Sequence, residues 1–184
     1  RCPASILLAH YQQNISDNHL DVGVGSGYFL DKVNFPALNP RVALMDLNPN
    51  SLDFCSRRIE RYQPQNLQRN VLEPIDYQGD KFDSLGMNLL LHCLPGTMLE
   101  KACAFDHLLP LLNPGARVFG ATILQGDVPR NLAARGAMKV YNRKGIFSNQ
   151  NDSLASLKQA LESRLDQVDV QVKGCMALFS GSRP

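Results

Sequence analysis

A chain of 184 residues is long enough to form one domain with a sizeable core. Its formal charge of +2, with basic residues scattered along the chain, is too small to indicate a nucleic-acid-binding surface. The sequence holds no apolar run that could span a bilayer and no secretory signal, and its five cysteines lack CxxC spacing. These features predict a cytoplasmic protein with reduced thiols, without a metal site, and without a membrane or nucleic-acid partner.

A glycine-rich turn follows the first predicted strand. The chain begins with an amphipathic helix over residues 5–13, and a strand over 19–22 then runs into glycines at alternate positions, Gly23, Gly25 and Gly27. Glycine lets the backbone press against a ligand, and the free N–H groups of the helix predicted from the turn to Val33 favour a carboxylate or phosphate. Asp21 precedes the first glycine by two residues and could accept hydrogen bonds from the same ligand.

The second predicted strand, Arg41–Asp46, ends in a carboxylate. It is apolar nearly throughout, as a strand buried on both faces should be. In a βαβ unit, Asp46 would lie beside the glycine turn and could accept both hydroxyls of a ribose. It could also be a turn aspartate, because Asn48-Pro49-Asn50 follows, and the two roles are compatible. Asn50 or Ser51 is the predicted cap of the next helix.

Polar residues also follow the third and fourth predicted strands, which lie over 66–72 and within 81–91. Asn70 could accept from an adenine amino group through its carbonyl, or it could be a turn residue. His92 stands where the fourth strand ends, before Pro95-Gly96. Because ligands of open α/β sheets bind at the C-terminal ends of strands, we expect His92 to face a substrate. The alternative is a core histidine.

The second half of the chain contains a long, mixed segment, residues 125–151. Loops of this length are often functional, and its candidates are Tyr141, Asn142 and Phe147, although ordinary lid packing would explain each of them equally well. A helix is also predicted within this segment, over 131–141. The other predicted elements are a helix over 97–112, which Asn113-Pro114-Gly115 would end, and a strand over 117–124. A capped helix over 152–165 and a two-stranded hairpin over 167–180 complete the chain.

Four of these stretches, in this order, resemble motifs of the class I S-adenosylmethionine-dependent methyltransferases. They are the Asp21–Gly27 turn, Asp46, the Asn70–Pro74 stretch, in which Asn70 replaces the family's usual aspartate, and the Phe82–Pro95 stretch. The resemblance covers residues 17–181. It implies a doubly wound, Rossmann-like α/β fold with a seven-stranded sheet of order 3-2-1-4-5-7-6, the last strand antiparallel, and helices on both faces. Residues 1–184 are expected to be a single domain that lacks some N-terminal residues, with 125–151 as its substrate-side insertion.

The resemblance also implies a function and the residues that carry it. A small-molecule acceptor would take a methyl group from S-adenosyl-L-methionine by in-line displacement. The protein could also form a homodimer. His92 is the first candidate for a catalytic base and Tyr141 the second. The backbone near Asn88 would hold the methionine amino group. The residues expected to bind the cofactor are Asp21, Gly23, Gly25, Gly27, Asp46, Leu47, Asn70, Val71, Leu72 and Asn88.

Other function classes fit the sequence less well. The amine-methylating DNA and glutamine enzymes use an Asn/Asp-Pro-Pro-Tyr/Phe tetrapeptide that this chain lacks. An NAD(P)-dependent Rossmann reductase needs a glycine three residues after the second one, and counting from Gly25 or Gly27 gives Tyr28 or Leu30. A P-loop is excluded because no Gly-Lys-Ser/Thr follows. The alternative from another class is a non-catalytic cofactor-binding or interaction domain, against which His92 and the long segment argue.

Overall fold

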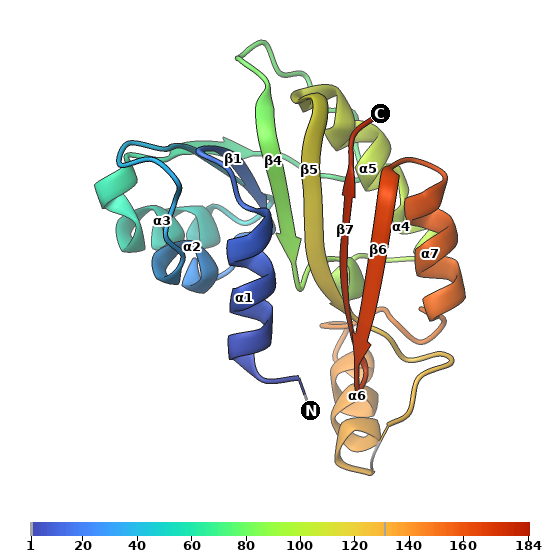
Figure 1. Ribbon diagram of the computed structural model, residues 1–184. Coiled ribbons are helices and arrows are strands. Elements are labelled where there is room, and N and C mark those ends of the chain that lie inside the picture. The colour runs from blue at the N-terminus through green and yellow to red at the C-terminus, as the bar shows by residue number, and fades with distance from the viewer. Residues whose placement is uncertain (1, 131) are drawn as a thin grey trace.

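One mixed sheet of seven strands organises the fold. The computed structural model describes residues 2–130 and 132–184. The strands are β1 (Asn18–Val22), β2 (Arg41–Asp46), β3 (Gln65–Gln68), β4 (Phe82–Asn88), β5 (Leu112–Ile123), β6 (Asp166–Lys173) and β7 (Met176–Ser182). They lie in the order β3-β2-β1-β4-β5-β7-β6, with β7 antiparallel to both of its neighbours (Figure 1). The predicted strand order is therefore confirmed.

Helices cover both faces of this sheet. The α-helices are α1 (Ala4–Asn14), α2 (Tyr28–Lys32), α3 (Pro49–Arg58), α4 (Met98–Lys101), α5 (Cys103–Leu108), α6 (Leu132–Arg143) and α7 (Leu154–Glu162). Short 3-10 helices η1, η2 and η3 span Glu60–Tyr62, Leu91–Cys93 and Leu109–Leu111. α1, α2 and α3 lie on one face and α4, α5 and α7 on the other, while α6 lies beyond the C-terminal end of β5 (Figure 1). None of the helices in the described residues is both long and apolar enough to cross a bilayer.

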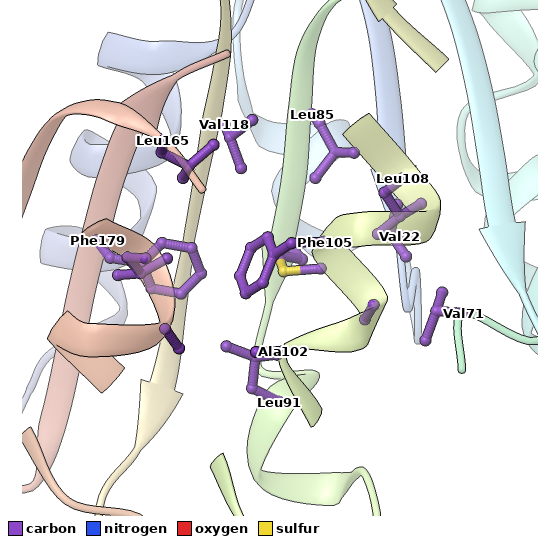
Figure 2. Packing of buried hydrophobic residues seen from close by; sticks show 14 of the residues in the cluster. Val22, Val71, Leu85, Leu91, Ala102, Phe105, Leu108, Val118, Leu165 and Phe179 are labelled. Carbon is purple, nitrogen blue, oxygen red and sulfur yellow. The ribbon is translucent and has the colours of Figure 1, made fainter. Parts of the chain in front are cut away.

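The sheet divides the core into two layers, because successive side chains of a strand point to opposite faces. On β2, Met45 belongs to the layer beneath α4, α5 and α7, whereas Leu44 belongs to the layer beneath α1, α2 and α3. In the first layer the rings of Phe105 and Phe179 meet edge to face, with centroids 6.3 Å apart (Figure 2). A strand that is buried on both faces needs a continuous apolar run, which is why β2 could be predicted.

The elements around the glycine turn differ from the prediction. β3 ends at Gln68 instead of at residue 72, because β2, with which it pairs, ends opposite at Asp46. α2 has only five residues. α3 is capped by Asn48, whose side chain accepts from the N–H of Asn50 at 3.0 Å, and not by Asn50 or Ser51. A proline takes the first helical position, so the cap falls on the residue before it.

The region predicted as one helix over 97–112 is divided into α4, α5 and η3. Pro110 lacks an N–H group, so it cannot continue α-helical hydrogen bonding. Leu112 already pairs with Phe82 of β4. Asn113-Pro114-Gly115 therefore lies within β5, at a register shift in its pairing, and does not end a helix.

Candidate active site

Several predicted site residues meet at one edge of the sheet. Gly23 directly follows β1, and its N–H donates to the carbonyl of Met45 at 2.8 Å. Asp46 is the last residue of β2, and Asn88 is the last residue of β4. β1 lies between β2 and β4, so the C-terminal ends of three parallel strands form this edge. Open α/β sheets bind their ligands at such an edge.

The glycines of the turn serve different purposes. Gly25 and Gly27 have φ angles of 49° and 68°, in the left-handed region. A Cβ at Gly27 would lie 2.6 Å from the Sγ of Cys55, so this glycine lets α3 pack against the turn. A Cβ at Gly25 would meet no described atom within 4 Å, so the backbone there borders open space. The five-residue α2 supplies a weaker dipole than the longer predicted helix, which leaves the turn itself as the ligand-facing feature.

Asp21, the next-to-last residue of β1, is buried. Burial raises the pKa of its carboxyl to about 7, and hydrogen bonds from the Tyr11 hydroxyl and the Val22 backbone oppose this rise only in part. The Tyr11 hydroxyl, from α1, also lies 2.8 Å from Nε2 of His19, whose Nδ1 lies 2.8 Å from Oγ of Ser84. Burial lowers the pKa of His19 to about 3, so this histidine is neutral. A cationic group beside Asp21 would return the carboxyl to its charged form.

Asp46 has the turn role and retains an oxygen for a ligand. Its Oδ1 accepts from the N–H of Asn48 at 2.9 Å. Within the described part of the chain, no hydrogen bond reaches its other oxygen, Oδ2. The next residue, Leu47, is 62% exposed and places an apolar surface beside the carboxylate. A polar sugar and an apolar ring could be bound side by side here.

Asn70 lies in a turn after β3 and not in the strand. Its Oδ1 accepts from the N–H of Leu72 at 3.1 Å, and its Nδ2 donates to Oε1 of Glu73 at 2.8 Å. Val71, within the turn, is buried. The amide thus shapes the turn, and a ligand could use only the second lone pair of its carbonyl oxygen.

The side-chain amide of Asn88 is buried without a hydrogen-bond partner. Asn88 is 8% exposed, and neither Nδ2 nor Oδ1 bonds to any described group. An unpaired buried polar group costs roughly 1–3 kcal/mol, so such groups are rare. An unused donor and acceptor beside the glycine turn fit a ligand with polar groups, such as the amino acid end of S-adenosyl-L-methionine. The residues present therefore fit this cofactor.

His92 is buried in η2, just beyond the end of β4. Burial, together with the charge of Lys101, lowers the pKa of its ring to about 4, so the ring is neutral at pH 7. The N–H of Ile123 donates to Nδ1 at 3.4 Å. Nδ1 is then the acceptor, and Nε2 carries the proton. A ring in this form is a weak base and a hydrogen-bond donor, which favours orienting a substrate over removing its proton.

The segment between α6 and α7 brings Phe147 onto His92. The two rings meet edge to face with centroids 4.7 Å apart. The ring of Tyr141, which is 42% exposed, lies 4.9 Å from that of Phe147. Asn142 points inward, where its Nδ2 donates to Oδ1 of the buried Asn149 at 2.9 Å. Of the three candidates from residues 125–151, Tyr141 and Phe147 therefore share an aromatic cluster with His92, and Asn142 of α6 holds the segment in place.

A cavity of about 640 Å³ opens beside this aromatic cluster. Cys93 and Thr97, from η2 and the residue before α4, line one wall. Asn142, Phe147 and Ser148 line the other. Cavities of about 300–1,000 Å³ hold drug-sized ligands, so the volume suits a small molecule.

Sequence reasoning missed the buried polar residues that fasten the second wall. Nζ of Lys101 donates to Oδ2 of Asp152 at 2.7 Å and to the carbonyl of Ser148 at 2.6 Å. Asn149, also buried, donates to the last carbonyl of β5 at 2.9 Å. One signal was present in the sequence: Lys101 stands three residues after the buried Met98, at a position of the apolar helix face where a core residue belongs.

The chain is similar to known proteins over nearly its whole length. A family model described as a methyltransferase domain matches residues 20–118. Demethylluteothin O-methyltransferase of Streptomyces thioluteus is 37% identical over 178 residues, which cover 97% of this chain and 77% of that protein. N-methyltransferase vrtF of Penicillium aethiopicum is 35% identical over 183 residues, which cover 97% and 74%. The crystal structure of N-methyltransferase NodS from Bradyrhizobium japonicum WM9 in complex with S-adenosyl-L-homocysteine has the same fold, with a TM-score of 0.68 at 16% identity over 98% of this chain and 86% of that one.

Proposed function

Because this chain belongs to the S-adenosylmethionine-dependent methyltransferases, we propose that its methyl acceptor is a small molecule. The observation that carries this proposal is the cavity of about 640 Å³ between η2 and the segment before α7, which we name the acceptor cavity. Its volume lies in the range of small-ligand sites. The relative in Streptomyces thioluteus is named for methylating demethylluteothin, which supports the same class of acceptor.

The enzyme uses S-adenosyl-L-methionine as its cofactor. When bound, the cofactor supplies a methyl group that its sulfonium already activates for in-line displacement. We propose that Asp46 accepts from the ribose hydroxyls through Oδ2 and that Asp21 and Asn88 hold the charged amino acid end. Leu47 and the turn of Asn70–Leu72 would contact the adenine. The glycine turn would let the backbone approach the ligand.

The protein's own contribution is to position the acceptor and to exclude water, because the methyl group arrives activated. His92 is only 3% exposed and does not line the acceptor cavity itself, but it packs against Phe147 of the cavity wall. Its neutral ring would support that wall and would orient an acceptor oxygen that reaches Nε2. Tyr141, whose ring is half exposed at the end of α6, is the second candidate for a base if the acceptor must lose a proton.

A transfer assay with methyl-labelled S-adenosyl-L-methionine tests the acceptor class. The relatives are named for oxygen and for nitrogen methylation, so the panel should contain hydroxylated aromatic compounds and small amines. A protein mixture and duplex DNA are the competing acceptors. We expect label in small molecules alone, and label found only in protein or DNA would overturn the proposal.

Calorimetry measures cofactor binding directly. We expect the protein to bind S-adenosyl-L-methionine and not NADH. A homodimer and a cytoplasmic location stay predictions, which sedimentation and cell fractionation would check.

A further inference from the structure

Residues 145–151, between α6 and α7, form one wall of the acceptor cavity without containing a helix or a strand. An irregular segment keeps its position only where other contacts fix it. Here they include a buried ion pair and hydrogen bonds to both main-chain groups of Ser148.

Ser148 is tied to the opposite wall through its N–H and its carbonyl. Its N–H donates to the carbonyl of His92 at 2.8 Å, and its carbonyl accepts from Nζ of Lys101 at 2.6 Å. The same Nζ donates to Oδ2 of Asp152 at 2.7 Å, and both of these charged side chains are fully inaccessible to solvent. The carbonyl of Asp152 accepts from the N–H of Gln125, so the far end of the segment is fixed to the end of β5.

Lys101 joins the two walls of the cavity. Thr97 and Glu100 line the wall opposite residues 145–151, and Lys101 is the next residue of α4. Its side chain passes into the core and binds the carbonyl of Ser148, beside Phe147. The buried ammonium group of Lys101 is therefore one of the contacts that fix the distance between the walls.

A buried ion pair is weak evidence for stability, because desolvation cancels much of its attraction. An apolar pair of similar volume could fill this space, but it could not hold the Ser148 carbonyl. We propose that Lys101 and Asp152 are positioning residues that hold residues 145–151 against His92 and so set the width of the acceptor cavity. The role assigned to the cavity rests on the proposed function, and the first two measurements below need no acceptor.

The substitution Asp152→Asn gives a test in which two explanations predict opposite signs. It keeps the shape of the side chain and removes the charge that balances Lys101. If residues 145–151 stayed in place, the unbalanced ammonium would lower the pKa of His92 further. If they loosen, water reaches the ring and the pKa of His92 rises from about 4 toward 6.5. We expect a rise in an NMR titration of the ring, and a fall or no change in the folded variant would overturn the proposal.

The double variant Lys101→Met/Asp152→Leu removes the pair without leaving a charge buried. We expect solvent exchange of the Ser148 N–H to become about tenfold faster or more, while that of the Gly23 N–H in the cofactor site is unchanged. With an acceptor identified in the labelled panel, the acceptor KM should rise about tenfold while the Kd of S-adenosyl-L-methionine stays the same. Unchanged Ser148 exchange, an unchanged acceptor KM, or an equal loss of cofactor affinity would each overturn the positioning role.

Arg164→Met is the matched control. Arg164, two residues after α7, also makes a tertiary contact, through two hydrogen bonds of 2.7 and 2.8 Å to the carboxylate of Asp106 in α5, but the side chains of this pair are 23% and 51% exposed. We expect it to leave the His92 titration and the Ser148 exchange unchanged. If the parent protein transferred methyl groups to no small molecule, the proposed function would fail. The His92 titration and the Ser148 exchange would still test whether Lys101 and Asp152 hold residues 145–151 in position.

Discussion

Replacing Asp21 with asparagine should stabilise the cofactor-free protein at alkaline pH. Burial raises the pKa of Asp21 to about 7 from its ordinary value of 3.8. Between these two values the folded protein holds a proton that the unfolded chain has lost, so the free energy of unfolding falls as the pH rises through this window. Each pH unit of difference corresponds to about 1.4 kcal/mol, and the whole loss, complete above pH 7, is about 4 kcal/mol.

Denaturation of the parent and Asp21→Asn at pH 4 and pH 8 measures this loss. Asparagine does not ionise, so the two proteins should differ little at pH 4, and the variant should be more stable by as much as about 4 kcal/mol at pH 8. Calorimetry at pH 8 should show at least about tenfold weaker binding of S-adenosyl-L-methionine, because a charged acceptor is lost. A stability difference that is the same at both pH values would refute the buried, neutral carboxyl. Unchanged cofactor affinity would refute its role in binding.

Three further substitutions test the site. Asp46→Asn keeps an acceptor for the N–H of Asn48 and removes the charge, so calorimetry should show about tenfold weaker cofactor binding or more, and equal affinity would contradict the ribose assignment. Gly25→Val should abolish cofactor binding in a folded protein, because its side chain would fill the space that Gly25 borders, and a complex with the cofactor far from Gly25 would refute this. His92→Ala should lower kcat about tenfold or more without changing cofactor affinity, and His92→Gln should restore most of it; a glutamine variant as slow as alanine would identify a base.

The strand order followed from the resemblance to the methyltransferase family, and a buried strand such as β2 could be predicted from its own apolar run. Elements whose bounds depend on a neighbouring strand could not be predicted from their own residues. β3 ends at Gln68 because its partner β2 ends opposite it, and residues 69–72 contain no feature that predicts this end. Likewise, Leu112 joins β5 because Phe82 is available to pair with it.

The same distinction applies to the site. Asp46 and Asn88 end strands and the glycines follow one, so the topology brings them to the same edge of the sheet. Lys101 and Asp152 are 51 residues apart in the chain, and only the packing of α4 against the start of α7 brings them together. The lowered pKa of His92 also could not be predicted from the sequence, because burial and the charge of Lys101 cause it.

The contact between Tyr11 and Asp21 joins α1 to the cofactor site, although α1 lies outside the residues that the family model matches. The family match begins at residue 20 and contains every glycine and carboxylate of the motifs. A fragment that began at residue 20 would lose Tyr11 of α1 and His19 of β1, whose rings meet edge to face. Burial of Asp21 would then decrease, and the pKa of its carboxyl would fall toward the ordinary value. α1 therefore tunes the acidity of a group that the motif alone would leave untuned.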